Sequence, residues 1–302
     1  MLAKSKRSFS GLSDDDAYVP IDLVTKHYRQ RASTPGTLLI AEATFKAPKA
    51  GGIDNFPGIW SDAQVEAWKK VVNAVHAQGS YIFLQLVAMG RVALPAVLSR
   101  PDSPSNLGGP YPFVVPPAIP IPTADLRIIP HPLMHEEILE YIDLYGQAVH
   151  NVVHRGGFDG IEIYGSKGCL VDQFIQDVSN KRMDQWGGSI ENQTRFPLEV
   201  IKEVNCTSLN LAWLRIKTGP DSSDSESAYI SARGYTPEAA IKAVEKSVGL
   251  VAFGRYFTSN NTISLIPYDR STFYPPKSTY GYADYAFADK ESEDKYEKVD
   301  KL

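Results

Sequence analysis

The sequence predicts an α/β fold in which parallel strands and helices alternate along the chain. Apolar runs of about four to eight residues recur along the sequence, as expected for buried strands. Segments whose apolar residues repeat at helical spacing lie between these runs. Because the two signals alternate throughout and do not cluster, they favour consecutive βα units around a parallel sheet.

Each predicted element has its own local signal. The predicted strands cover residues 37–44, 81–86, 160–163, 209–216, 229–232 and 249–253. The predicted helices cover residues 21–32, 62–78, 135–154, 170–178, 190–204 and 237–246. The second helix has the clearest boundaries, with Ser61 as its N-cap and Gly79 at its C-terminal end. Residues 91–134 are rich in proline and have no period, which predicts a long loop, such as a lid, a binding loop or a disordered segment.

Composition narrows the possible classes of function. The chain has 302 residues and a hydrophobic content of 43%, so we expect one large domain at 1–288, followed by a charged, disordered tail at 289–302. A net charge of −4 offers no basic surface for nucleic acid, and no apolar run is long enough to cross a membrane. Two cysteines, Cys169 and Cys206, form neither a disulfide framework nor a metal cluster. We therefore expect a cytoplasmic protein without a metal site, and the oligomeric state stays open.

The most informative stretch is residues 158–196. A short apolar strand at 160–163 contains one internal acid and runs into a polar turn between Gly165 and Gly168. Apolar residues then repeat at helical spacing after the turn. Polar groups at the carboxyl end of a parallel strand are where α/β enzymes place their chemistry, so we expect the functional site here.

This stretch resembles the old yellow enzyme family, the FMN-dependent NADPH ene-reductases, in its filamentous-fungal branch. The residues that match the family pattern are Asp172, Gln173, Phe174, Gly187, Gly188, Ser189, Ile190, Glu191, Asn192, Arg195 and Phe196. Three positions depart from it: Tyr164 stands where the family has His, Lys167 where it has Asn, and Cys169 where it has Tyr. The resemblance covers residues 19–287 and implies a TIM (β/α)8 barrel.

The barrel is expected to be incomplete, because six strands are predicted and a closed barrel needs eight. Family members begin with a strand that precedes the helix at 21–32, and here that strand is missing or degenerate. They also have a fifth strand after the helix at 190–204. Here the chain passes almost directly to residues 209–216, which resemble the sixth strand of the family. The missing fifth strand would have carried a flavin-binding arginine.

A flavin phosphate needs a cradle of backbone N–H groups, which barrels build from the loops after their last two strands. Gly234, before a predicted helix, and Gly254 with Arg255, after the last predicted strand, suit this requirement, and Arg255 could grip a phosphate. The resemblance implies the same roles. It adds flavin contacts by Ala43 and Gln85 and places Arg233 where the family has a glycine of the cradle. Taken alone, Gln85 could equally be a satisfied core amide, and Arg255 could be a surface ion pair.

In the family, a His/Asn pair binds the substrate carbonyl, FMN delivers a hydride to the β-carbon, and a Tyr supplies the α-proton. The resemblance assigns the carbonyl to Tyr164 and Lys167, and both side chains can donate hydrogen bonds. Cys169 becomes the candidate acid, with a shorter reach than Tyr. Tyr274 is implied to lie by the flavin and the substrate. Val87 replaces a Trp that is usual in the family, which opens or reshapes the pocket.

The expected function is therefore an FMN- and NADPH-dependent oxidoreductase that reduces the activated C=C bond of a small enone or similar molecule, in fungal secondary metabolism. Two alternatives stay open at this point. The three substitutions and two lost strands are also what an inactive pseudoenzyme would show. A redox-neutral isomerase that keeps FMN but delivers protons differently is the third possibility.

Overall fold

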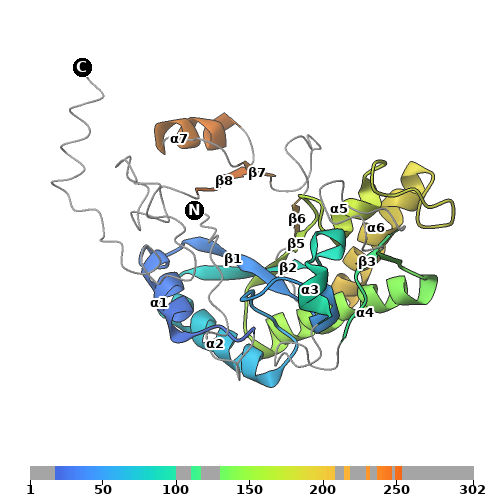
Figure 1. Cartoon of the computed structure of the whole chain (residues 1–302). Coiled ribbons are helices and arrows are strands. Elements are labelled where there is room, and N and C mark those ends of the chain that lie inside the picture. The colour runs from blue at the N-terminus through green and yellow to red at the C-terminus, as the bar shows by residue number, and fades with distance from the viewer. Residues whose placement is uncertain are drawn as a thin grey trace, which may run out of the picture.

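The computed structural model describes residues 18–99, 110–116, 130–207, 214–217, 229–231, 237–246 and 249–253. Its centre is a parallel sheet of four strands in the order β1-β2-β5-β6 (Figure 1). These strands are β1 (Leu38–Phe45), β2 (Tyr81–Val87), β5 (Gly160–Tyr164) and β6 (Leu214–Lys217). Nearly every residue of β1, β2 and β5 is buried or half-buried, as expected for a parallel sheet with both faces covered.

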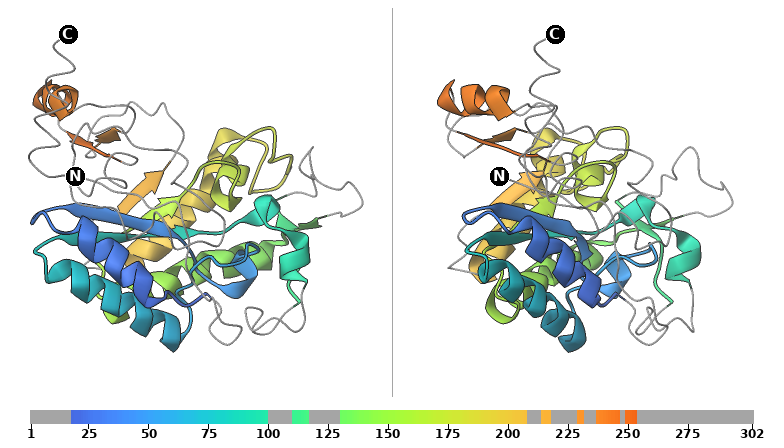
Figure 2. Two further views of the ribbon diagram at one scale, coloured as in Figure 1. Left: turned by 60° about the vertical axis from the view of Figure 1, so that its left-hand side comes forward. Right: turned by 90° about the vertical axis from the view of Figure 1, so that its left-hand side faces the viewer.

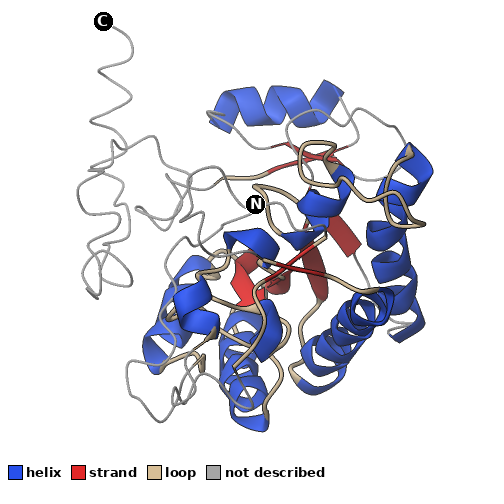
Figure 3. Ribbon diagram, turned by 45° about the vertical axis from the view of Figure 1, so that its right-hand side comes forward, coloured by secondary structure: helices blue, strands red, loops and turns tan. Residues whose placement is uncertain are grey.

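The helices lie outside the strands (Figure 3). Figure 2 shows α1 (Asp22–Arg31) and α2 (Asp62–His76) along one face of the β1 and β2 part of the sheet. They are followed by α4 (His135–His150), which continues into a π turn at Asn151–Arg155, and by α6 (Ile190–Thr207). Buried residues four positions apart form one stripe on each long helix and build the core: Trp68, Val72; Tyr141, Tyr145, Val149; Phe196, Val200, Val204.

The other two predicted strands form a separate pair in the described part of the chain. β7 (Tyr229–Ser231) pairs in parallel with β8 (Gly249–Val251), and α7 (Pro237–Lys246) lies between them in sequence. All six predicted strands are therefore present. In the described residues, this pair has no ladder to the four-stranded sheet, so the sheet is not closed there.

The predicted start of α2 is confirmed. Ser61 Oγ accepts a hydrogen bond from Gln64 N at 3.3 Å, and Gln64 Oε1 accepts one from Ser61 N at 3.1 Å. This reciprocal capping box satisfies two donors that a helix start leaves without partners. The predicted end was two residues too late, because α2 ends at His76 and Gly79 has a left-handed backbone (φ +70°).

Two predictions need correction. The helix predicted at 170–178 ends early: α5 spans Leu170–Ile175, since Gln176 is extended (φ −87°, ψ 125°). The predicted loop at 91–134 contains short elements, because backbone groups buried there need partners. They are η2 (Gly90–Val92), α3 (Pro95–Leu98), β3 (Val114–Val115) and β4 (His131–Pro132), the last two paired in parallel; a further turn, η1 (Pro48–Ala50), follows β1.

Among the described residues, no helix is both long enough and apolar enough to cross a membrane.

Candidate functional site

The carboxyl ends of β1, β2 and β5 meet at an apolar cluster, which we call the mouth cluster. Its buried members are Tyr18, Phe45, Val87, Met89, Ala93, Leu98 and Cys169. Half-buried residues pack against them, namely Ala43, Ile53, Phe56, Trp60, Val92, Tyr111, Phe113 and Tyr164. Three residues predicted from the sequence, Ala43, Tyr164 and Cys169, are thus brought together at the edge where parallel α/β proteins place their sites.

Gln85 lies beside this cluster on β2. The strand register places Ala43 opposite Gln85, and Gln85 opposite Glu162 of β5. Gln85 is completely buried, and its Nε2 donates a hydrogen bond to Glu162 Oε1. Its Oε1 is buried and has no hydrogen-bond partner among the described residues. A buried acceptor that lacks a donor is costly, and the described residues alone do not satisfy Gln85 as a core amide.

Tyr164 is the last residue of β5 and is half-buried at the edge of the mouth cluster. Burial raises the pKa of its hydroxyl above the ordinary value of 10.0, and nearby Cys169, Glu162 and Asp172 raise it further, while the neighbouring Ser166 hydroxyl lowers it. The net shift is upward, so the hydroxyl keeps its proton at neutral pH and can donate a hydrogen bond. Cys169 is buried close to it.

The turn after β5 is fixed by the two polar residues that open α5. Asp172 Oδ2 accepts a hydrogen bond from Gly168 N at 2.7 Å. Gln173 Nε2 donates to the carbonyl oxygens of Gly168 (2.6 Å) and Met89 (3.1 Å), and its Oε1 accepts from Arg91 N at 3.2 Å. These bonds tie the turn to the loop after β2. The sequence showed Asp172 and Gln173 only as a motif, and the structure gives them this holding role.

Lys167 stands at the tip of that turn. Its backbone is left-handed (φ +58°), which few non-glycine residues adopt, and its side chain is exposed. The structure therefore places Lys167 on the same turn as Tyr164 and Cys169 but outside the mouth cluster. The other predicted site residues, Arg233, Gly234, Gly254, Arg255 and Tyr274, lie outside the described residues.

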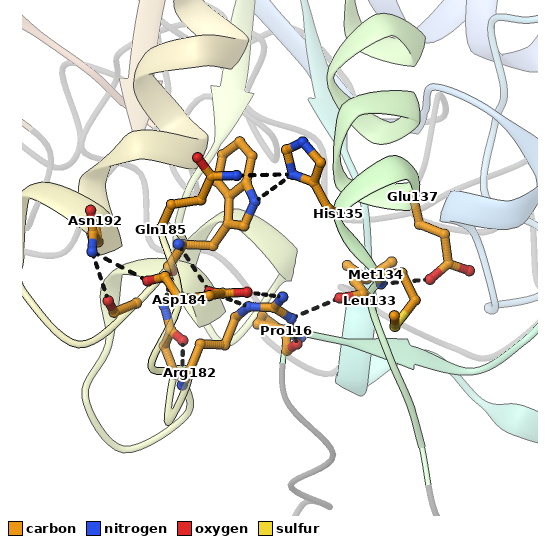
Figure 4. Close-up of polar contacts among 12 residues, drawn as sticks. Pro116, Leu133, Met134, His135, Glu137, Arg182, Asp184, Gln185 and Asn192 are labelled. Atoms are coloured by element: carbon orange, nitrogen blue, oxygen red, sulfur yellow. Dashed lines mark hydrogen bonds and ion pairs between the residues drawn. The ribbon is translucent and has the colours of Figure 1, made fainter.

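The second half of the motif, residues 187–196, holds the segment that follows α5; Figure 4 shows Asn192 of this motif beside Asp184. Asn192 Nδ2 donates to the carbonyl oxygens of Asp184 (3.2 Å) and Gly187 (3.1 Å). Arg195 Nε donates to Gln185 O at 2.8 Å. The ring of Phe196 stacks on that of Phe174 of α5, with centroids 4.2 Å apart. The motif thus holds the segment between α5 and α6 and does not itself carry a reacting group.

Comparison with known proteins decides the family. Residues 8–217 match the profile of the NADH:flavin oxidoreductase / NADH oxidase family, an FMN family. The chain belongs to this family. A chanoclavine-I aldehyde reductase, fgaOx3 of Penicillium roqueforti, is 38% identical over 90% of this chain and 89% of the relative. The NADP-dependent oxidoreductase lnbE of Aspergillus flavus is 36% identical over 91% and 89%, and the probable inactive reductase easA of Epichloe festucae var. lolii is 35% identical over 91% and 88%.

Solved structures give the same family and its fold. The old yellow enzyme from Pichia sp. AKU4542 is 31% identical, has a TM-score of 0.80, and aligns over 95% of this chain and 89% of its own. Morphinone reductase is 30% identical, with a TM-score of 0.76 over 96% and 93%. The expected family is confirmed: this is an old-yellow-enzyme-like FMN oxidoreductase of the TIM-barrel class, reduced by a nicotinamide nucleotide.

The residues described around the mouth cluster fit an FMN cofactor. The orphaned Gln85 Oε1 is an acceptor that the N–H edge of a flavin ring could satisfy. Ala43, whose side chain is small, lies opposite Gln85 on the neighbouring strand. Among the described residues, no group of His, Cys, Asp and Glu could hold a metal ion.

Proposed function

We propose that this protein reduces the activated C=C bond of a small enone or conjugated aldehyde, with NADPH as the electron source. The observation that carries the proposal is the juxtaposition of Tyr164 and Cys169 with the apolar mouth cluster, directly beside the orphaned amide oxygen of Gln85. Bound FMN supplies the hydride in this family. The residues of the chain then have to hold the substrate, polarise its carbonyl group and provide a proton.

Tyr164 is the proposed donor to the substrate carbonyl oxygen. Its raised pKa keeps a proton on the hydroxyl, and its place at the strand end lets it reach into the cluster. A neutral donor aimed at a developing enolate stabilises that charge more strongly in an apolar site than in water. Lys167, exposed on the same turn, is proposed to add positive charge near the enolate, and Cys169 to stand where the proton for the α-carbon is delivered.

The proposed cofactor contacts come from both halves of the chain. Ala43 and Gln85 face the flavin ring, and Arg233, Gly234, Gly254 and Arg255 hold its phosphate by their place in the family pattern, while Tyr274 contacts the substrate. Support for NADPH and for an aldehyde or enone comes from relatives whose names read "NADP-dependent oxidoreductase" and "Chanoclavine-I aldehyde reductase". Small-molecule reduction in fungal secondary metabolism, in the cytoplasm, is the setting we propose.

We also propose that the barrel is an incomplete one within a single domain at 1–288, with residues 289–302 as a charged tail. The alignment with the A. flavus relative spans 349 positions, which is more than the 302 residues of this chain, so the relative has segments that this chain lacks. β5 pairs directly with β6, and only six residues separate α6 from β6. That is too few for a further strand and its crossover, which need about a dozen residues or more.

A catalytically inactive protein is the second candidate. It is favoured by the substitutions at Tyr164, Lys167 and Cys169 and by similarity to a relative named "Probable inactive reductase easA". A redox-neutral isomerase that keeps FMN is the third.

Two measurements on the purified full chain separate these candidates. Visible flavin absorbance after reconstitution with FMN distinguishes a cofactor-binding protein from one that binds none. NADPH oxidation that requires added cinnamaldehyde or 2-cyclohexenone, with the saturated product recovered, identifies a reductase. A yellow protein that converts an enone to an isomer without NADPH consumption is an isomerase. A colourless protein with no turnover would reject our proposal.

A further inference from the structure

Arg182 joins three segments that are far apart in the sequence (Figure 4). It lies in the connection between α5 and α6, and its side chain is only 12% exposed. Its Nη1 donates to the carbonyl oxygen of Pro116 at 2.5 Å and to that of Leu133 at 2.7 Å. Pro116 follows β3 and Leu133 follows β4, so one guanidinium holds the carboxyl ends of both strands.

The rest of the guanidinium is held by Asp184. Arg182 Nε and Nη2 donate to the two carboxylate oxygens of Asp184 at 3.0 and 2.5 Å. These hydrogen bonds keep the pKa of Asp184 below its ordinary value, so the carboxylate stays charged at neutral pH. Asp184 Oδ1 also accepts from Trp186 N at 3.0 Å. A planar guanidinium group that is paired with a carboxylate through two hydrogen bonds has a fixed orientation. Here that orientation points Nη1 at the carbonyl oxygens of Pro116 and Leu133.

The strands that Arg182 holds are too short to fix themselves. β3 and β4 have two residues each, and two backbone bonds join them: His131 N to Phe113 O at 2.7 Å and Leu133 N to Val115 O at 2.8 Å. An isolated two-stranded pair is marginal in water even when it is longer. The hydrogen bonds from Arg182 to the carboxyl ends of both strands are therefore a large part of what orders this pair.

The segment leading into β3 forms one wall of the mouth cluster. Tyr111 and Phe113, just before β3, pack against the cluster that contains Tyr164 and Cys169. Tyr111 N donates to Leu98 O at 3.0 Å, which fixes the other end of this short segment. We infer that Arg182 is a positioning residue, which sets the place of the Tyr111 and Phe113 wall and thereby the size and shape of substrate that the mouth cluster accepts.

This inference rests on the proposed function, since it assumes that the substrate enters the mouth cluster. The part of the inference that concerns the order of β3, β4 and the segment before them can be tested without turnover, and we call it the mechanical part. The variant that tests it is Arg182→Lys, because a lysine keeps the charge but cannot bind Asp184 with two parallel bonds and reach two carbonyls as well. Arg155→Lys is the matched control. Arg155 also pairs with an aspartate, Asp62, at 2.6 Å, and in the described part of the chain its side chain forms no hydrogen bond with β3 or β4.

Hydrogen–deuterium exchange of the full-length, FMN-reconstituted protein measures the mechanical part. In Arg182→Lys, amides in peptides covering 110–116 and 130–134 should exchange about 10- to 100-fold faster, because both Nη1 bonds are lost and two buried carbonyl groups are left without donors. Other peptides, and Arg155→Lys throughout, should match the wild type. Unchanged exchange in the two peptides, or an equal rise everywhere, would overturn the inference. If Arg182→Lys does not fold, Asp184→Asn is measured in its place. This variant weakens the pairing that orients the guanidinium while keeping Arg182, and the same two outcomes support or overturn the inference.

Equilibrium dialysis measures the functional part without needing turnover. The dissociation constant for cinnamaldehyde, the longer of the two ligands, should rise about 10-fold in Arg182→Lys, while that for 2-cyclohexenone should change about 2-fold or less. A tenfold rise in the dissociation constant corresponds, in binding free energy, to about the net contribution of one hydrogen bond. Equal effects on both ligands, or no binding of either by the wild type, would overturn the specificity role. Absence of NADPH oxidation alone would reject only the proposed function.

Discussion

Gln173 offers the sharpest test of how the candidate site is held together. Its buried side chain amide makes three hydrogen bonds to backbone groups of the turn after β5 and the loop after β2. Replacing it with methionine keeps the length and the apolar burial of the side chain but removes every one of these bonds. Each buried backbone group left without a partner costs about 1–3 kcal/mol, partly offset by the added apolar burial. We expect a loss of about 2–4 kcal/mol in the free energy of unfolding.

The assay is urea unfolding, followed by the circular dichroism of the helices. Gln176→Met is the matched control, because Gln176 is one turn away and exposed, and it makes a single long bond to Asp172 Oδ1 at 3.3 Å. A surface change of this kind should stay within about 0.5 kcal/mol. Gln173→Met should also reduce turnover more than FMN content, since it loosens the turn that carries Lys167. If both variants cost the same, the three bonds do not hold the turn and our description of the site is wrong.

Three further predictions follow from the same region. Gly90→Ala should be destabilising, with urea unfolding as the measure, because Gly90 has φ +56° and an added Cβ would lie 2.5 Å from Gln173 Nε2. Tyr164→Phe should lower kcat/KM for an enone by about 10²–10³-fold, the usual cost of removing one donor to a developing oxyanion, and the loss of rate at high pH that depends on Tyr164 should lie above about pH 10, since the pKa of Tyr164 is raised. Lys46 directly follows β1 and is buried, and its Nζ donates a hydrogen bond to Tyr141 O of α4. Burial lowers the pKa of Lys46, so the unfolded chain binds its proton more tightly, and this penalty in the wild type fades as pH rises toward the unfolded value. The stability of Lys46→Met relative to the wild type should therefore be higher at about pH 7 than at about pH 10. Equal effects of Lys46→Met at both pH values, measured by urea unfolding, would contradict that assignment.

Much of the fold could be predicted because its signals are local. Ser61 caps its helix through bonds to a residue three positions away, and the strand at 160–163 is apolar and bounded by glycines, so both are visible in the sequence alone. The predicted loop at 91–134 failed for the opposite reason. β3 and β4 are held by backbone bonds between residues about twenty positions apart and by Arg182, and neither signal has a period.

The candidate site divides in the same way. Resemblance located Ala43, Gln85, Tyr164 and Cys169, and the structure gathers them at the strand ends. It could not show that Gln85 keeps one oxygen without a donor, because that depends on the register between β2 and β5. Nor could it single out Arg182, whose partners are backbone carbonyls, which every residue possesses.

The state of the turn after β5 bears on whether the protein has lost its chemistry or changed it. Asp172 and Gln173, which hold this turn, keep the family residues, and their side chains make four hydrogen bonds to backbone groups of the turn and of the loop after β2. In this turn and at the strand end before it, the departures from the family pattern are Tyr164, Lys167 and Cys169, and each replacement still carries a proton that it can donate. Ser166 Oγ is a buried polar atom of this turn without a hydrogen-bond partner among the described residues, but the bonds of Asp172 and Gln173 that fasten the turn are kept. Random decay would be expected to remove these fastening bonds, since nothing would then select for them. A turn that is still fastened and that presents three altered donors therefore favours a changed reaction, or a changed substrate, over a protein that has lost its chemistry.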